Sequence, residues 1–560
     1  MYVLGISCFY HDSAAALLRD GAVVFAAAEE RYTREKHCIG FPHRAIAAAL
    51  AHEGIPIDAV DAVAFYEKPV LKFDRLLLSS LAAFPRGFPV FRRFVPLWFK
   101  RKLRTPATFR RELGYSKPVY YVEHHVAHAA SAFLPSPFAE AAIVTIDGAG
   151  EWATTTMGVG RGTAIELHDE VRFPHSLGLL YSTITAHLGF RVNNGEGKVM
   201  GLAAYGRPTF REAFDRLITL RPDGSFWLDM DYFAYLHRPA MASARLERLL
   251  GPPRAPGAEL TQRHRDIAGT LQAVVEEALL GMARRAHERT GLPKLCLAGG
   301  VALNCVANGR IVRETPFDEV FIPPATGDDG ASLGCAAYLY HTLMGHPRAA
   351  PLRTAALGDA FGPDATERVL SSRGIAARRC SRGDLVRRVA EAIAQDRVVG
   401  WFQDRMEFGP RALGCRSILA NPANPQMKYI LNSRVKHREP FRPYAPSVLL
   451  DEASRYFELD VPSPFMLLAA PVRPGQRDAL PAITHADGSA RIQTVDRETC
   501  PLFHDLIARV GELTGTPVVL NTSFNVRGEP IVRSPDDACN CFAGTGIDCL
   551  AIGDWIVEKA

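Results

Sequence analysis

Residues 142–150 read Ala142-Ile143-Val144-Thr145-Ile146-Asp147-Gly148-Ala149-Gly150, an apolar strand that runs into a glycine-rich turn. Alternating residues predict two further strands after it, with Gly160-Arg161-Gly162 as the turn between them. A similar design stands at the start of the chain, where strands are predicted at residues 3–7, 14–18 and 22–28. The recurrence indicates a diverged internal duplication.

Duplicated units of three strands followed by a helix are typical of the actin-like ATPases and sugar kinases, which bind nucleotide between their halves. We therefore expect an α/β fold with a duplicated actin-like domain over residues 1–347. Glycine and proline gather over residues 348–363, which predicts a linker. Residues 364–560 are expected to form a second α/β domain.

Composition narrows the class of protein. A chain of 560 residues is too long for one hydrophobic core, and 65 Lys and Arg against 60 Asp and Glu give a net charge of only +5. We therefore expect no nucleic acid as a partner. The first residues carry no basic leader and no apolar stretch is long enough to cross a bilayer, which favours a cytoplasmic protein without a membrane partner. Eleven scattered cysteines favour reduced thiols over disulfides. The oligomeric state is not predicted.

A second glycine-rich turn follows the strand predicted at residues 294–297 and leads into a helix. Glycines allow a ligand to approach the backbone, and a helix N-terminus offers free N–H groups. We predict that Gly299, Gly300 and Asn304 contact a nucleotide. A tight strand-to-helix connection that needs small residues would explain the same pattern.

Two histidines stand at helical spacing. His124 and His128 are four residues apart and would share one helix face, where their imidazoles could bind a divalent metal. Carboxylates from Asp147 and from residues 326–330 could complete a mixed nitrogen and oxygen site for iron(II), manganese or zinc. The alternative is that both histidines are hydrogen-bonded core residues.

Together and in this order, these motifs resemble the threonylcarbamoyl-tRNA-modifying ATPases. The chain is more closely similar to the O-carbamoyltransferases of nodulation-factor and antibiotic pathways, through His11-Asp12-Ser13-Ala14-Ala15 and through residues 196–206, Glu-Gly-Lys-Val-Met-Gly-Leu-Ala-Ala-Tyr-Gly. The resemblance implies that four residues bind a metal, iron(II) in the first place: His124, His128, Asp147 and Asp328.

The second predicted domain contains basic and polar segments at residues 408–417, 435–443 and 520–530. Clustered guanidinium groups can bind phosphate oxygens through paired hydrogen bonds, although such residues can also brace turns. The Lys-x-Arg element with Ser523-Phe524-Asn525 resembles the nucleotide site of the YrdC-type domain that forms carbamoyl-adenylate. The resemblance assigns Lys436, Arg442, Asn521 and Ser523 to that site, with Arg411, Arg416 and Arg491 as neighbours.

The resemblance predicts an ATP-dependent O-carbamoyltransferase that makes carbamoyl-adenylate from carbamoyl phosphate and ATP, with Mg²⁺ bound to the ATP. The carbamoyl group then passes to a hydroxyl of a secondary metabolite or saccharide. Lys436 and Arg442 are the expected catalytic residues of adenylation, and His11 is the candidate general base for the acceptor, or else a hydrogen-bonding residue of the first turn.

Three other functions fit part of the pattern: a tRNA-modifying enzyme of the threonylcarbamoyl type, a non-catalytic actin-like sensor of ATP or metal, and a plain sugar kinase. The low net charge and the nodulation-type motifs disfavour the first, and the polar set of the second domain disfavours the sensor. A sugar kinase would leave the carboxyl-terminal region without a purpose. Residues 86–111 interleave basic and aromatic residues, a pattern that could bind RNA or a membrane surface but that favours an amphipathic helical insertion with a solvated basic face.

Overall fold

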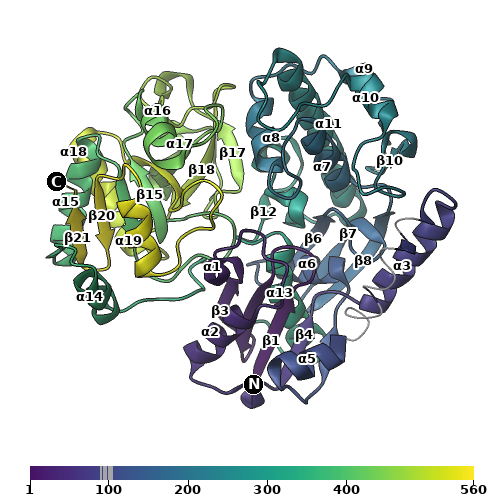
Figure 1. Ribbon diagram of the computed structural model, residues 1–560, viewed down its shortest axis with the longest axis horizontal. Coiled ribbons are helices and arrows are strands. Elements are labelled where there is room, and N and C mark those ends of the chain that lie inside the picture. Colours follow the sequence, from purple (N-terminus) through teal and green to yellow (C-terminus); the bar gives the residue numbers. More distant parts are fainter. Residues whose placement is uncertain (89–90, 93–97, 99–104, 560) are drawn as a thin grey trace. The chain divides into compact units, whose positions relative to one another are not determined.

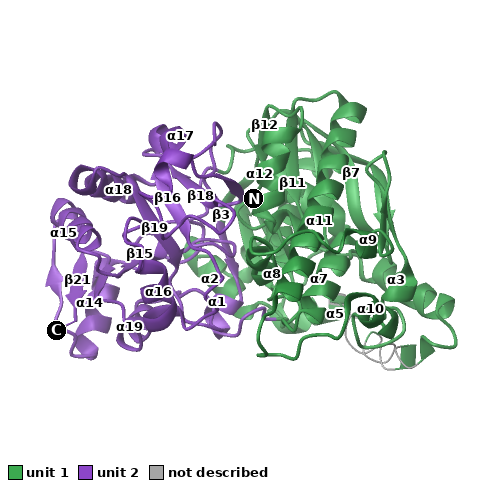
Figure 2. Ribbon diagram, turned by 90° about the horizontal axis from the view of Figure 1, so that it is seen from above, with its two compact units in different colours: residues 1–24, 39–352 green, residues 25–38, 353–560 purple. Residues whose placement is uncertain are grey.

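The computed structural model describes residues 1–88, 91–92, 98 and 105–559 of the chain. The chain divides into two compact units (Figure 2). Unit 1 contains residues 1–24 and 39–352, and unit 2 contains residues 25–38 and 353–560. A short amino-terminal segment therefore belongs to the otherwise carboxyl-terminal unit.

The first sheet of unit 1 confirms the three strands predicted at the start of the chain. Its order is β3-β2-β1-β4-β5, with β1 antiparallel to β2 and parallel to β4. The strands span Tyr2–Ser7 (β1), Ala14–Arg19 (β2), Ala22–Ala28 (β3), Ala62–Phe65 (β4) and Val119–Tyr121 (β5). The turn between β2 and β3 uses Asp20 and Gly21 at positive φ, as the Asp-Gly pair predicts.

The second sheet repeats this topology, in the order β8-β7-β6-β11-β12. Here β6 is antiparallel to β7 and parallel to β11. The strands span Glu140–Ile146 (β6), Ala153–Arg161 (β7), Ala164–Arg172 (β8), Lys294–Ala298 (β11) and Glu319–Phe321 (β12). Two five-stranded sheets of identical order confirm the internal duplication and the actin-like α/β fold of this part of the chain.

Two helices connect the sheets of unit 1. Helix α6 (His124–Phe133) packs on β6 and β11, helix α13 (Asp328–Ala337) packs on β1 and β2, and the two helices pack against each other (Figure 1). Gly334 makes this close approach possible, because a Cβ at this position would lie 1.9 Å from the carbonyl oxygen of Ala127 in α6. The amino-terminal ends of α6 and α13 are thereby brought together.

We expect Gly334→Ala to lower the unfolding free energy by about 1–3 kcal/mol, because the added methyl group forces α13 away from α6. Gly197 provides the matched control, since it is also helical but has open space where its Cβ would be; Gly197→Ala should be neutral or stabilising by up to about 1 kcal/mol. Urea unfolding of both variants checks this. Equal stabilities would contradict the packing argument.

The other helices of unit 1 surround these sheets, together with the short hairpin β9 (Ile218–Leu220) and β10 (Phe226–Leu228). They span His43–Glu53 (α2), Pro69–Ala82 (α3), Thr105–Leu113 (α5), Leu177–His187 (α7), Glu196–Ala203 (α8), Arg211–Phe214 (α9), Ala244–Leu250 (α10), Gln262–Thr290 (α11) and Cys305–Glu314 (α12). In the described part of the chain, every helix is too short or too polar to span a bilayer. Half of the predicted insertion at residues 86–111 lies outside the described residues.

Unit 2 is built on one mixed sheet of nine strands, in the order β13-β21-β20-β14-β15-β19-β16-β18-β17. The strands span Arg378–Arg379 (β13), Val399–Phe402 (β14), Arg416–Ala420 (β15), Ala445–Leu449 (β16), Leu468–Pro471 (β17), Ser489–Val495 (β18), Val518–Ser523 (β19), Cys549–Ile552 (β20) and Trp555–Glu558 (β21).

Helices α15 (Arg382–Ala394) and α18 (Pro501–Thr514) cover one side of this sheet, with Trp401 buried in the core between them. The remaining helices span Glu30–Thr33 (α1), Pro363–Ser372 (α14), Met427–Leu431 (α16), Ala453–Tyr456 (α17) and Pro535–Ala543 (α19). Helix α1 joins this unit through Arg31, which donates to the Gly409 carbonyl at 2.7 Å, and the next residues join it through Arg34, which donates to the Ile531 carbonyl at 2.7 Å. All eleven cysteines are free thiols in the structure.

Candidate functional site

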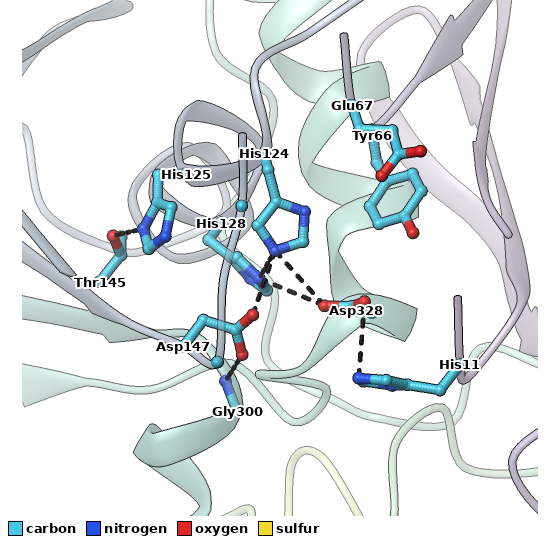
Figure 3. Close-up of polar contacts among 12 residues, drawn as sticks. His11, Tyr66, Glu67, His124, His125, His128, Thr145, Asp147, Gly300 and Asp328 are labelled. Atoms are coloured by element: carbon cyan, nitrogen blue, oxygen red, sulfur yellow. Dashed lines mark hydrogen bonds and ion pairs between the residues drawn. The ribbon is translucent and has the colours of Figure 1, made fainter. Parts of the chain in front are cut away.

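Four side chains meet where α6 and α13 begin: His124, His128, Asp147 and Asp328, whose ligand atoms all lie within 4.8 Å of one another (Figure 3). The Nε2 atom of His124 lies 3.1 Å from Nε2 of His128 and 3.2 Å from Oδ2 of Asp147. The Asp328 carboxylate lies 3.5 Å from His124 and 3.6 Å from His128. The structure therefore brings together the complete predicted set.

The local structure explains why these ligand atoms converge. The spacing of four residues puts His124 and His128 on one face of α6, while His125 points away and bonds the Thr145 hydroxyl at 2.6 Å. The Gly300 N–H donates to Oδ1 of Asp147 at 2.9 Å, which turns Oδ2 towards His124. Gly300 thus orients a member of the cluster.

The cluster fits a divalent cation. Two imidazole nitrogens face each other and two carboxylates, all four residues are buried, and both carboxylate oxygens of Asp328 have no hydrogen-bond partner among the described residues. Burial opposes charge here, yet the histidines hold the pKa of Asp147 well below its usual range. Two nitrogen and two oxygen donors suit iron(II), manganese or zinc.

The Glu151 carboxylate orients α6. It accepts hydrogen bonds from the His124 backbone N–H, at 3.0 Å to Oε2, and from the Lys68 N–H, at 2.7 Å to Oε1. A helix N-terminus leaves such N–H groups without partners inside the helix and favours negative charge. Glu151 is buried, and its place shortly after the Asp147 turn is its one signal in the sequence.

We expect Glu151→Gln to weaken metal binding about 10-fold, because the first turn of α6 loses its charged partner while the four ligand side chains remain. Glu123→Gln is the matched control, since Glu123 precedes the same helix but pairs with Lys68 on the surface. Titration with manganese(II), followed by calorimetry, measures both. Equal loss in the two variants would contradict a specific role of Glu151.

His11 lies at the edge of the cluster, with Nε2 3.8 Å from Asp328 and Nδ1 2.9 Å from Asp12 (Figure 3). Burial disfavours its charged form, but the two carboxylates outweigh burial and raise the pKa of His11 to about 10. In this arrangement the imidazole is a donor. His11 can therefore act as a base, as predicted, only when the Asp328 carboxylate is paired with a group other than His11.

The glycine-rich turn is used largely by the fold itself. Gly299 has φ +93°, and a Cβ there would lie 2.1 Å from the Ile146 carbonyl oxygen, so the turn requires glycine. The Asn304 amide caps α12, with Oδ1 3.2 Å from the Ala307 N–H, and exchanges two hydrogen bonds with Gln272. Contact of these three residues with a nucleotide remains a prediction.

Lys436 occupies the centre of the candidate site in unit 2. Its side chain is buried, and its ammonium contacts oxygens of Ser523 and Asn525, with Oδ1 of Asn525 at 2.8 Å and its carbonyl oxygen at 3.0 Å. Among the described residues no carboxylate is within ion-pair distance. Burial, followed by the nearby Arg438 charge, holds the pKa of Lys436 well below its ordinary value.

Further cations lie near Lys436. Arg442 is separated from Glu439 by 3.9 Å, and burial together with the charges of Arg438 and Arg491 lowers the pKa of Arg442 to about 10. Arg411 is partly exposed in the turn before β15. The structure thus places Lys436, Ser523, Arg442 and Arg491 in one region, and it adds Asn525, whose side chain the sequence pattern included but did not assign.

Two further residues predicted for this site are buried and bonded to the backbone. Arg416 is fully buried, packs its guanidinium 3.7 Å from the centre of the Phe402 ring, and donates to backbone carbonyls, among them that of Asp359 at 3.2 Å. Asn521 is also buried, and its amide donates to the Ala412 carbonyl at 3.2 Å and to Ser447 at 3.0 Å. Both hold the turn at residues 408–417, and their direct contact with a nucleotide remains a prediction.

Comparison with known proteins agrees with these features. Residues 2–337 match the family described as Carbamoyltransferase N-terminus, and residues 390–559 match Carbamoyltransferase C-terminus. An uncharacterized protein of Synechocystis sp. is 46% identical over 594 aligned positions, covering 100% of this chain and 97% of the relative. Nodulation protein NolNO of Sinorhizobium fredii is 39% identical, covering 98% of this chain and 79% of the relative. Nodulation protein U of the same species is 28% identical, with 96% of each covered.

The duplicated sheets and the buried histidine–carboxylate cluster define an actin-like α/β protein joined to a second unit with a mixed sheet. With both family regions matched in order along the chain, it belongs to the carbamoyltransferase family and is an enzyme of that family.

Proposed function

We propose that the chain is an ATP-dependent O-carbamoyltransferase that forms carbamoyl-adenylate and transfers its carbamoyl group to a hydroxyl of a small molecule. The observation that carries the proposal is Lys436, a buried ammonium in unit 2 with neutral oxygen partners and no carboxylate within ion-pair distance among the described residues. A buried charge of this kind is costly unless an anion neutralises it. Phosphate oxygens of ATP or of carbamoyl phosphate would do so.

The chemistry of adenylation fits a basic site. Carbamoyl phosphate and ATP, with one water consumed, give carbamoyl-adenylate, orthophosphate and pyrophosphate, so negative charge must be stabilised on several phosphate oxygens. Lys436 and Arg442 would hold these oxygens, with Ser523 orienting the Lys436 ammonium and Arg411 and Arg491 contributing charge. The ATP substrate is expected to carry Mg²⁺.

Transfer to the acceptor is assigned to unit 1. A divalent cation held by His124, His128, Asp147 and Asp328 would supply Lewis-acid polarisation of a carbonyl oxygen. His11 is the group of this chain placed to receive the proton of the acceptor hydroxyl, and Asp12 orients its ring through Nδ1. For this step the imidazole must be neutral, as noted above.

The proposal is tested by incubating the purified chain with carbamoyl phosphate, ATP, Mg²⁺ and iron(II), without an acceptor. Mass spectrometry should detect carbamoyl-adenylate, and pyrophosphate should form in equal amount. A matched reaction without carbamoyl phosphate should give neither product. If the complete mixture gives no adenylate, even with candidate alcohols present, the proposal fails and a sensor of ATP or metal becomes the better account.

A further inference from the structure

Helix α3 directs two basic side chains towards the interior of unit 1. Lys72 and Arg75 are three residues apart and therefore share a helix face, and they are only 5% and 7% exposed. Basic residues are rarely this buried without compensation. None of the roles assigned so far uses them.

The charge of Lys72 is compensated. Its ammonium forms a buried ion pair with Glu67, which is 1% exposed. The same ammonium lies 5.1 Å from the centre of the Tyr10 ring, next to His11 in the chain. Lys72 and Glu67 are thus a neutral pair within the protein.

The charge of Arg75 is not compensated in the same way. Its Nη1 donates to the Gly150 carbonyl at 2.5 Å, and its guanidinium lies 4.8 Å from the centre of the Phe173 ring. Among the described residues, no carboxylate is within ion-pair distance, and the buried Nε atom has no hydrogen-bond partner. Burial lowers the pKa of Arg75, and the nearby Tyr10, Glu151 and Glu67 offset this only in part.

Arg75 stands close to the histidine–carboxylate cluster. Gly150 follows Asp147 by three residues, and a Cβ on Gly150 would lie 3.1 Å from ring and Cβ atoms of His124. Figure 3 shows Glu67, the partner of Lys72, on the side of the cluster away from Gly300. Arg75 thus reaches the cluster through the Gly150 carbonyl, and the Glu67 partner of Lys72 lies away from the glycine-rich turn to which the nucleotide was assigned.

We propose that Arg75, supported by the Lys72–Glu67 pair, forms an anion subsite beside the cluster that binds a carboxylate or phosphate group carried by the hydroxyl acceptor. A guanidinium presents several N–H groups in one plane and matches such oxygens in pairs. The inference rests on the proposed transfer to a hydroxyl, because it names the class of acceptor as an acidic alcohol. The leaving adenylate could supply the same chemistry and is the competing source.

The first test uses inorganic phosphate as the probe and the full chain at a fixed manganese(II) concentration. Calorimetric titrations compare Arg75→Met with Arg211→Met, which removes an arginine that is 45% exposed and paired with Asp215. Both changes are also made in the Lys436→Ala background, which removes the anion site proposed in unit 2. We expect Arg75→Met to weaken the remaining phosphate binding roughly 10-fold, Arg75→Lys to restore part of it, and Arg211→Met to leave it unchanged.

Thermal unfolding without phosphate distinguishes a binding role of Arg75 from a purely structural role. If Arg75 is a binding residue whose buried charge has no ion-pair partner, Arg75→Met should melt at the same temperature as wild type or at a higher one. A melting temperature that falls, with unchanged phosphate affinity, would mean that Arg75 only supports the Gly150 carbonyl, and the proposal would be overturned.

AMP as a second probe distinguishes the two sources of the anion. If the subsite serves the acceptor, Arg75→Met binds AMP as wild type does. A loss of AMP affinity comparable to the loss of phosphate affinity would assign the subsite to the adenylate and overturn the acceptor class. These readouts need no turnover, so a failure of the proposed carbamoyl transfer in the activity assay would be seen separately.

Discussion

Lys436→Met is expected to lower the rate of carbamoyl-adenylate formation by about 100- to 1000-fold, the range found when one charged stabilising group is removed from a reaction centre. Methionine keeps most of the side-chain volume, so the packing around this buried position is retained. Pyrophosphate release from ATP and carbamoyl phosphate, together with mass spectrometry of the adenylate, measures the effect.

The structure offers a matched control for this variant. Arg497→Met removes a cation from the same unit, but the Arg497 side chain is 74% exposed and forms a surface ion pair with Asp505, so adenylate formation should not change. Manganese(II) binding by the cluster of unit 1 should be unchanged in both variants, because the cluster contains no residue of unit 2. If Lys436→Met is folded and retains at least a third of the wild-type rate, Lys436 does not hold the reacting phosphate.

The sequence predicted the fold and the histidine pair of the cluster because both depend on short-range patterns. Strand periodicity and glycine turns predicted the two sheets of unit 1, because the two halves share a similar pattern and fold with the same strand order. The spacing of His124 and His128 determined one face of α6. The family resemblance, and not the spacing, selected Asp328 from the acidic residues that follow β12.

Other contacts of the site residues could not be predicted from the sequence, because they join side chains to backbone groups far away in the chain. Arg416 and Asn521 have the residue types of a phosphate site, but carbonyl groups far away in the chain use their donors. No local pattern reveals which carbonyl lies opposite a polar side chain. For the same reason, Glu151 and Arg75 read as ordinary surface charges in the sequence, and the placement of residues 25–38 in unit 2 had no sequence signal.

Asp328→Asn is expected to abolish tight metal binding, with an affinity loss of more than about 100-fold, while the rate of adenylate formation stays at the wild-type level. The substitution preserves shape but removes the negative charge that faces both His124 and His128. An amide oxygen is a weaker ligand for a divalent cation, and the amide nitrogen cannot be one. Metal content by mass spectrometry and titration with manganese(II) measure the loss.

Transfer and adenylation should separate in this variant. We expect Asp328→Asn to accumulate carbamoyl-adenylate without carbamoylating an alcohol, and to lose the rise in melting temperature that manganese(II) causes in wild type, because only a ligand that binds the folded state stabilises it. Asp329→Asn is the neighbouring control, since Asp329 accepts from the Gly330 N–H at 2.9 Å and lies outside the cluster. If Asp328→Asn binds manganese(II) as tightly as the Asp329 variant, the four residues are a hydrogen-bonded core cluster and carbamoyl transfer must be assigned to other groups of unit 1.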